Sequence, residues 1–213
     1  ILERLGLNVS EVPHVDVEAV RFRFEEATLT FRIAGRHALR IVWRQEFDAW
    51  LARQAQARGL ALYEGKEAES LSLDTHQVTV VTAGEEWHAE IVVGADGANS
   101  RVRRALFPNQ PIATARTLET FIPCHRQDHN EESAEFDLSF LPQGIAGYVW
   151  DFPTLINGEA MHSLGIYDTN LLAKQKRPPL REVLTQAKPQ SHPIRYFAPA
   201  QPLSRERVLL VGD

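Results

Sequence analysis

The stretch that decides the fold is residues 92–104, Val92-Val93-Gly94-Ala95-Asp96-Gly97-Ala98-Asn99-Ser100-Arg101-Val102-Arg103-Arg104. An apolar strand runs here into a turn that contains Gly94 and Gly97, and glycine lets a backbone bend sharply and approach a ligand. Ser100 then offers a side-chain cap for a short helix, whose N-terminus favours anionic groups. The stretch therefore predicts a phosphate or dinucleotide loop, with an ordinary turn before a capped helix as the alternative.

The composition of the chain excludes several classes of protein. Its 213 residues, 44% of them hydrophobic, suffice for one large domain or two small ones. The net charge of −5, with both signs interspersed, leaves no basic stripe, so we expect no nucleic-acid partner. A single cysteine, Cys124, excludes an internal disulfide and favours a reducing, cytoplasmic compartment. No apolar run approaches the roughly 20 residues of a membrane span, so any membrane contact is expected to be peripheral. A start without Met and a stop after an apolar strand favour a piece of a longer protein.

Hydrophobic periodicity predicts strands and a helix before the loop. Alternating residues indicate a hairpin at 17–24 and 27–33, and apolar spacing of three and four predicts a helix at 45–58 with Gly59 as its C-cap. Short strands separated by turn residues predict a β-meander at 60–63, 68–73, 77–82 and 86–93.

A second strand-rich section is expected after the loop. A short helix at 101–106 ends before Pro108, and the next predicted elements are strands at 111–123, 134–141, 146–152 and 161–167. A helix at 180–187, an extended connection at 189–202 and a terminal strand at 207–211 complete the pattern.

The loop at 92–104 closely resembles the Asp-Gly motif of FAD-dependent hydroxylases, halogenases and geranylgeranyl reductases. The resemblance implies that Asp96 and Gly97 lie near the pyrophosphate of FAD, with a further role in the use of NAD(P)H. Arg101 and Arg104 would lie on the helix beyond the loop, either near the cofactor or on a solvated face, and Arg103 is expected on the solvated face.

The end of the chain, residues 207–213, looks like the second cofactor motif of the same superfamily, a strand followed by Gly212-Asp213. By this resemblance the Asp213 carboxylate would accept hydrogen bonds from the ribitol hydroxyls. The hypothesis requires the Asp96 loop and Asp213 to meet at one nucleotide-shaped groove.

Residues 39–51 are similar to the family pattern of a strand, an arginine and a helix. The resemblance places Arg44 against the FAD diphosphate, which a guanidinium suits. The alternative for Arg44 is a surface ion pair with Glu46 or Asp48. By the same resemblance Ala68 would offer backbone groups to the adenine end of FAD.

A substrate signal lies at residues 147–153, where Tyr148, Trp150 and Phe152 alternate and so project from one face of a strand. Core packing is the plain explanation of such a stripe. The string nevertheless resembles the Tyr-x-Trp-x-Phe-Pro motif of geranylgeranyl reductases, which implies a role for Pro153 and for Gly165 as well. Tyr167 stands where that family has a second glycine.

No residue is predicted to act as the catalytic group, because a flavin carries the hydride itself. Cys124, His125 and His129 suggest metal ligation, but their charged surroundings favour a solvated loop, and no metal is expected. The Gly-x-Gly-x-x-Gly turn of dinucleotide-binding folds does not occur in this sequence.

The fold class expected is α+β. A partial FAD-binding lobe, Rossmann-like and three-layered with the β-meander, is predicted at 41–107 and 206–213. An antiparallel-sheet substrate lobe is predicted at 1–40 and 108–205.

The function expected from the resemblance is FAD-dependent, NAD(P)H-driven reduction of C=C bonds in an apolar, isoprenoid substrate. One alternative is an FAD-dependent aromatic monooxygenase, whose substrate would be a small aromatic molecule. An alternative of another class is a truncated, non-catalytic chain that binds an apolar ligand.

Overall fold

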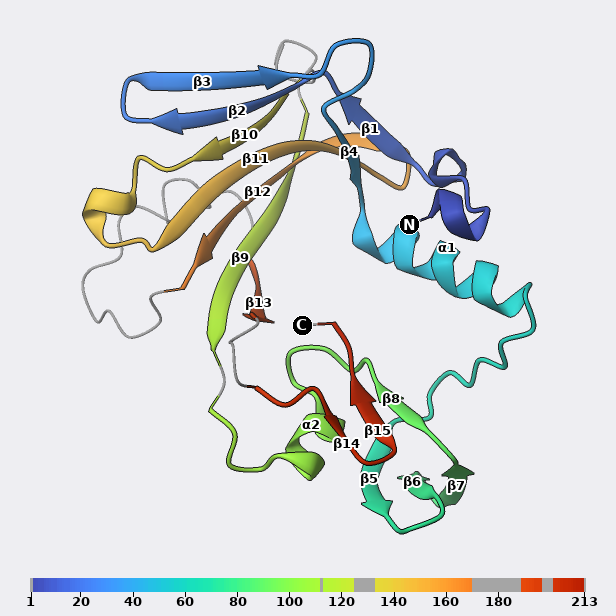
Figure 1. The fold of residues 1–213 in the computed structure, drawn as a ribbon. Helices are drawn as coiled ribbons and strands as arrows, with labels where there is room; N and C mark the ends of the chain where they lie inside the picture. Colours follow the sequence, from blue (N-terminus) through green and yellow to red (C-terminus); the bar gives the residue numbers. More distant parts are fainter. Residues whose placement is uncertain (1, 112, 125–132, 170–188, 197–200, 213) are drawn as a thin grey trace. The chain divides into compact units, whose positions relative to one another are not determined.

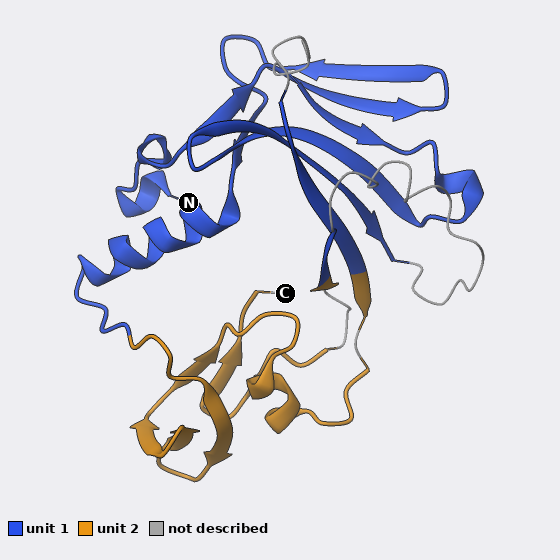
Figure 2. Cartoon of the chain, turned by 180° about the vertical axis from the view of Figure 1, so that it is seen from behind, with its two compact units in different colours: residues 1–62, 116–192 blue, residues 63–115, 193–213 orange. Residues whose placement is uncertain are grey.

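The computed structural model describes residues 2–111, 113–124, 133–169, 189–196 and 201–212 (Figure 1). The chain divides into two compact units, residues 1–62 with 116–192 (unit 1) and residues 63–115 with 193–213 (unit 2), as Figure 2 shows. Strands dominate both units and helices are few, which confirms the α+β class. The predicted FAD-binding and substrate lobes are defined by the ligand that each would bind, whereas the two compact units are defined by packing alone. The lobe boundaries therefore stay predictions.

A seven-stranded sheet forms most of unit 1. In spatial order its strands are β13 Gln190–Arg195, β9 Thr114–Pro123, β12 Glu159–Asp168, β11 Gly147–Ile156, β10 Ser133–Asp137, β2 Ala19–Phe24 and β3 Ala27–Arg32. The pairs β9–β12, β12–β11, β11–β10 and β2–β3 are antiparallel, whereas β10 and β2 are parallel. The β11–β12 hairpin turns at Asn157-Gly158, with φ of 52° and 81°, the pattern of a type I′ turn.

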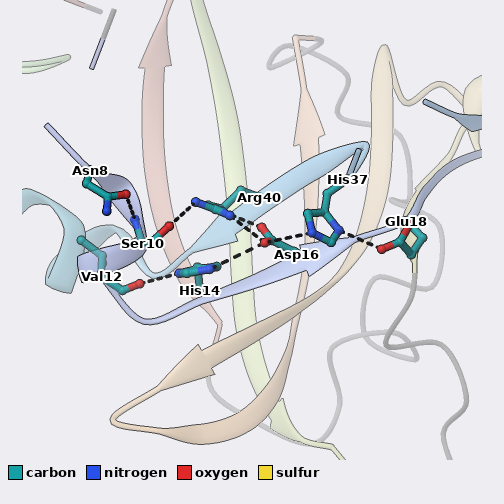
Figure 3. A network of polar contacts seen from close by, with 8 residues as sticks. All are labelled: Asn8, Ser10, Val12, His14, Asp16, Glu18, His37 and Arg40. Carbon is teal, nitrogen blue, oxygen red and sulfur yellow. Dashed lines mark hydrogen bonds and ion pairs between the residues drawn. The ribbon is translucent and has the colours of Figure 1, made fainter. Parts of the chain in front are cut away.

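A smaller pair of strands leads to the first α-helix. β1 His14–Val17 pairs antiparallel with β4 Leu39–Val42, and Asp16 lies opposite Arg40 (Figure 3). The carboxylate of Asp16 accepts hydrogen bonds from Nε and Nη2 of Arg40, both at 2.6 Å, and Nε2 of His37 lies 3.4 Å from the same carboxylate. The Arg40 hydrogen bond lowers the pKa of Asp16 although burial opposes the shift. This cross-strand pair fixes the strand that positions the helix.

The predicted helix is confirmed as α1 Arg44–Gln56. Its buried anchor is Trp50, whose indole Nε1 donates to Glu11 at 3.1 Å. The turn after the helix ends at Gly59, with φ of 97°, where Leu60 N–H donates to Ala55 O and Gly59 N–H to Gln56 O. This is the Schellman pattern, and it confirms Gly59 as the C-cap glycine.

Unit 2 contains two small sheets and a short helix. The meander consists of β5 Ala68–Leu73, β6 Val78–Thr82 and β7 Glu85–Ala89, all antiparallel. The second sheet has the order β14 Ser204–Arg205, β15 Val208–Leu210, β8 Val92–Gly94, with β15 and β8 parallel. Helix α2, Arg101–Leu106, follows β8. The buried core of the unit consists of Val78, Val102, Leu106 and Val208.

Three strand predictions were wrong in detail. Residues 60–63 form no strand, since no described strand pairs with them and Leu60, Leu62 and Tyr63 are 56%, 40% and 58% exposed. The strand expected at 86–93 is two strands, because β7 pairs within the meander and β8 pairs with β15. The first strand of the hairpin likewise divides at Glu18, since β1 pairs with β4 and β2 with β3.

Other boundaries moved in the second strand-rich section. The strand expected at 134–141 ends earlier, because β10 ends at Asp137 and residue 141 begins the 3₁₀ turn η3, Leu141–Gln143. Near the start of the chain lie two more described 3₁₀ turns, η1 Glu3–Leu5 and η2 Val9–Glu11. Within the stretch 189–202, predicted as an extended connection, the structure has the strand β13. Pro193 argued against a strand there, but β13 lies at one end of the described sheet, where proline is tolerated. The helix expected at 180–187 lies outside the described residues.

Candidate functional site

The loop between β8 and α2 has the backbone that its glycines predict. A Cβ at Gly94 would lie 2.8 Å from Cβ of Val102, so only glycine lets α2 pack this closely on β8. Gly97 has φ of 70°, in the left-handed region that glycine adopts without strain. The strand, loop and helix therefore form as the sequence predicts.

The Asp96 carboxylate caps helix α2. Its Oδ2 accepts hydrogen bonds from the backbone N–H groups of Arg101, at 2.6 Å, and Val102, at 3.2 Å. Burial alone would raise the pKa of Asp96, but hydrogen bonds from the Ser100 hydroxyl and these N–H groups outweigh it, and the net shift is downward. Ser100 Oγ in turn accepts from Arg103 N–H at 2.9 Å. The capped-helix alternative thus describes the hydrogen bonds of Asp96, and its role toward a cofactor stays a prediction.

A cavity of about 470 Å³ joins the two predicted cofactor motifs within unit 2. Asp96 and Gly97 line it on one side and Gly212 on another. They meet because β8 and β15 are parallel neighbours that end at the same edge, and Val211 N–H donates to Gly94 O at 3.0 Å. Asp213 itself lies outside the described residues.

Two arginines of this cavity were not anticipated as site residues. Arg103, expected on a solvated face, is half-buried and lines the cavity, and its guanidinium has no hydrogen-bond or ion-pair partner among the described residues. Burial, and then the charges of Arg195 and Arg104, lower the pKa of Arg103. Arg195 donates to Ala98 O at 2.8 Å and to the hydroxyl of Thr114. The cavity therefore presents positive charge and free N–H donors, which fit an anionic phosphate group.

A second cavity of about 800 Å³ in unit 2 lies along β5, β8 and α2. It is lined by Ala68 and Arg101 and also by Asp96. Arg101 Nη1 donates to the carbonyl oxygen of Ala68 at 3.1 Å, and Nη2 lies 2.6 Å from a Glu67 oxygen. The structure thus brings Ala68, Asp96 and Arg101 together, but the Ala68 carbonyl already accepts a bond from the protein.

Arg44 begins helix α1 in unit 1, and its side chain is 79% exposed. It donates to both carboxylate oxygens of Asp48 at 3.1 Å, so the surface ion pair proposed as the alternative is present. An exposed pair of this kind contributes about 0.3–0.5 kcal/mol. Its cofactor role stays a prediction.

The aromatic stripe lies on one face of the seven-stranded sheet. Tyr148, Trp150 and Phe152 follow one another at ring-centroid distances of 6.3 and 6.2 Å. Burial, and then Tyr167, raise the pKa of the Tyr148 hydroxyl. Pro153 is buried and, being one residue on, lies on the opposite face of β11. The wall therefore consists of the three rings without Pro153.

Gly165 supports the wall from the next strand. It is the register partner of Trp150, and a Cβ at Gly165 would overlap the indole ring. The indole Nε1 donates to Ser163 Oγ at 2.9 Å, and that hydroxyl donates to Glu119 Oε1 at 2.7 Å. Gly165, Ser163 and Glu119 thus hold the Trp150 ring against β12. Of these three residues, the sequence predicted only Gly165 as a site residue.

Within the residues that the structure describes, no group of three or more His, Cys, Asp or Glu side chains is arranged to hold a metal ion. His125 and His129 lie outside those residues. None of the described helices is long and apolar enough to span a bilayer.

The strand, the glycine-flanked loop and the capped helix beside a basic cavity are features found in nucleotide-binding folds. The family described as FAD binding domain matches residues 9–128, more than half of the chain, so the chain belongs to this family. This membership supports the prediction of FAD, and NAD(P)H stays a prediction.

Two curated proteins are similar in sequence. A digeranylgeranylglycerophospholipid reductase of Methanocella arvoryzae is 28% identical over 215 residues, which cover 93% of this chain and 54% of that protein. A probable electron transfer flavoprotein-quinone oxidoreductase of Escherichia coli is 32% identical over 96 residues, covering 42% of this chain and 22% of that protein. The matched part of this chain thus spans about half of the length of the first relative and about a fifth of the second.

Solved structures share the fold. The halogenase PltM, in complex with phloroglucinol and FAD, matches with a TM-score of 0.65 and 16% identity over 95% of this chain and 49% of its own. A 2,6-dihydroxypyridine-3-hydroxylase from Arthrobacter nicotinovorans matches with a TM-score of 0.61 and 17% identity over 100% of this chain and 63% of its own. At such identities the likeness concerns the fold alone.

Proposed function

We propose that this protein is an FAD-dependent oxidoreductase that reduces C=C bonds of an apolar, isoprenoid substrate, with NAD(P)H as the reductant. The observation that carries the proposal is the aromatic wall of Tyr148, Trp150 and Phe152, held over Gly165. Three adjacent rings bind an apolar chain by burying its surface, at about 25 cal/mol per Å². The similarity to a protein named as a digeranylgeranylglycerophospholipid reductase supports this substrate class.

The cavity of unit 2 is proposed to hold the phosphates of FAD. Arg103 has a half-buried guanidinium without a hydrogen-bond or ion-pair partner in the part of the chain that the structure describes, and it would donate to a phosphate oxygen there. Gly97 and Gly212 have open space around the position of a Cβ, so their backbones are accessible to a ligand. FAD, when bound, supplies hydride transfer. Arg44, Asp96 and Asp213 stay proposed contacts of the cofactor.

The chain's own residues would then position the substrate. Trp150 cannot turn away from the sheet face without breaking its hydrogen bond to Ser163, which Glu119 orients. The rings beside it exclude water from the double bond. These residues thus supply orientation and a dry surface.

The experiment is product analysis with the whole protein in the absence of oxygen. NADPH and an isoprenoid alkene are supplied, and mass spectrometry follows the substrate. We expect a product that has gained two hydrogens without any need for oxygen. An oxygen-dependent product carrying a new hydroxyl group would instead establish the monooxygenase, which the fold shared with a hydroxylase keeps as the second candidate.

A further inference from the structure

We infer that the outer edge of β3 pairs with the same edge of a second copy of this chain, so that the two sheets join across a two-fold axis. β3 is the last strand in the order of the seven-stranded sheet, and β2 pairs with its inner edge (Figure 1). None of the described strands pairs with the outer edge. Such an interaction surface does not depend on the proposed function.

The outer edge of β3 lacks the features that normally prevent strands from pairing. All six residues of the strand are exposed, among them Leu29 at 58% and Phe31 at 51%. The strand contains no proline and no lysine, its only charged residue is Arg32 at its end, and its register with β2 has no bulge. An edge of this kind presents a row of free backbone groups. It is therefore a surface that a further strand can occupy.

The turn before β3 determines which backbone groups point outward. Residues 25–26 form a two-residue turn, so the flanking pair Phe24 and Ala27 is hydrogen-bonded, and bonded and non-bonded pairs alternate from there. The carbonyl oxygen of Arg23, in the next pair, confirms this alternation, because it faces away from β3 and accepts from Leu138 N–H at 2.8 Å. The outward N–H and C=O groups of β3 therefore belong to Thr28, Thr30 and Arg32.

A two-fold axis at Leu29 satisfies these outward groups. It places Thr28 of each copy opposite Thr30 of the other, and both residues have free groups on the facing edge, as a bonded antiparallel pair requires. It also places Leu29 opposite its own copy and Phe31 opposite Ala27, so that a large side chain lies across from a small one. Cross-strand neighbours of this kind stabilise a sheet. The strand is thus complementary to itself.

The charges at the two ends of β3 select this register. With the axis at Leu29, Glu26 of each copy lies opposite Arg32 of the other, which gives two pairs of opposite charge. Axes at residue 28 or 30 also satisfy the backbone, but neither places a charge opposite Arg32. The Leu29 register is therefore the one that satisfies both the backbone and the charges.

Glu26 and Arg32 are free to make this contact with another chain. Both side chains are exposed, and neither has an ion-pair partner in the part of the chain that the structure describes. Within one copy the two are six residues apart along the strand, about 20 Å, which is too far for an ion pair. An antiparallel strand of the same sequence brings the two signs together, and the occupant of this edge is therefore a second copy.

The dimer is expected to be weak and to contain two copies. A contact between two six-residue strands is smaller than the roughly 1,200 Å² of a stable interface, and it belongs with the transient complexes. The two-fold pairing uses the outer edge of both copies, so a third copy finds no free β3 edge.

The test is sedimentation velocity of the whole protein, with concentrations across the micromolar range, which measures the dissociation constant of the dimer. The variants are Glu26→Arg, Arg32→Glu and the double exchange of both residues. Glu86→Arg is the matched control, since Glu86 is also exposed and its exchange changes the net charge as Glu26→Arg does, but it lies on β7 in unit 2. All three side chains are exposed, so we expect every variant to fold, and circular dichroism checks this.

We expect a monomer–dimer equilibrium for the wild type. Each single exchange at the edge turns two pairs of opposite charge into like-charged pairs and should weaken the dimer at least about fourfold, whereas Glu86→Arg should leave the dissociation constant unchanged. The double exchange recreates opposite charges across the axis and should restore the wild-type value. That recovery distinguishes a contact between the two residues from a general effect of charge.

Four results would overturn the inference. Two concern the wild type, which would stay monomeric at the highest concentration or form species larger than a dimer. The other two concern the variants, if the single exchanges at the edge did not weaken the dimer or if the double exchange did not restore it.

Discussion

At the residue scale, Gly165 is required by one ring. A methyl group there would overlap the Trp150 indole, so Gly165→Ala should displace the ring and lower the free energy of unfolding by about 1–3 kcal/mol. Urea unfolding followed by tryptophan fluorescence measures the loss. The double variant Gly165→Ala with Trp150→Leu removes the overlapping ring and should show a smaller loss than the sum of the two single changes. Additive losses would mean that the two residues do not interact.

The Asp96 cap makes stability depend on pH. Its folded pKa is lowered from the ordinary value of 3.8, so its contribution is complete above that value and is lost as the pH falls through the folded pKa. Asn can still cap the helix but carries no charge, so Asp96→Asn should cost about 0.3–1 kcal/mol at neutral pH and less below pH 3.8. Urea unfolding at the two pH values measures the difference. A cost that is the same at both would show that the carboxylate charge is not what stabilises the helix.

At the scale of elements, the β1–β4 pair depends on a two-pronged contact between Arg40 and Asp16. A lysine keeps the charge but cannot donate two parallel hydrogen bonds. Arg40→Ala should lower the free energy of unfolding by about 0.2–1 kcal/mol, the contribution of a cross-strand pair, and Arg40→Lys should lower it by most of that amount. Urea unfolding at low and high salt checks this expectation. If the lysine variant were as stable as the wild type, charge alone would hold the strands.

Local signals made the elements around the loop predictable. The glycines and Ser100 fix the turn and the cap through neighbours within a few residues, and Gly59 ends α1 in the same way. Residues 60–63 show the opposite case. Their apolar pattern suits a strand, but a strand also needs a partner, and none of the described strands pairs with them. Sequence pattern alone does not contain that information.

At the scale of the whole molecule, the candidate sites depend on contacts between distant parts of the sequence. The cavity at Asp96 includes Arg195, whose guanidinium bonds Ala98 from 97 residues away, within a stretch where prolines predict only an extended connection. Likewise, Phe22 stacks on Phe136, and no short motif connects these two residues. Motifs predicted Asp96, Gly212 and Trp150, and the three-dimensional pairing of strands added the rest.

The central claim is that the cavity lined by Asp96, Gly212 and Arg103 binds the phosphates of FAD. FAD titration of the whole protein tests this claim most directly. The measurement is the dissociation constant, from flavin fluorescence, for the wild type, Arg103→Met and Lys66→Met. Lys66 is the control, since it pairs with Glu85 in the same unit and lines neither cavity of that unit. Loss of a charge-assisted phosphate contact of about 1.5–3 kcal/mol predicts that Arg103→Met binds FAD at least tenfold more weakly, while Lys66→Met binds it as the wild type does. Undiminished FAD affinity in Arg103→Met would contradict the assignment of this cavity to the cofactor phosphates.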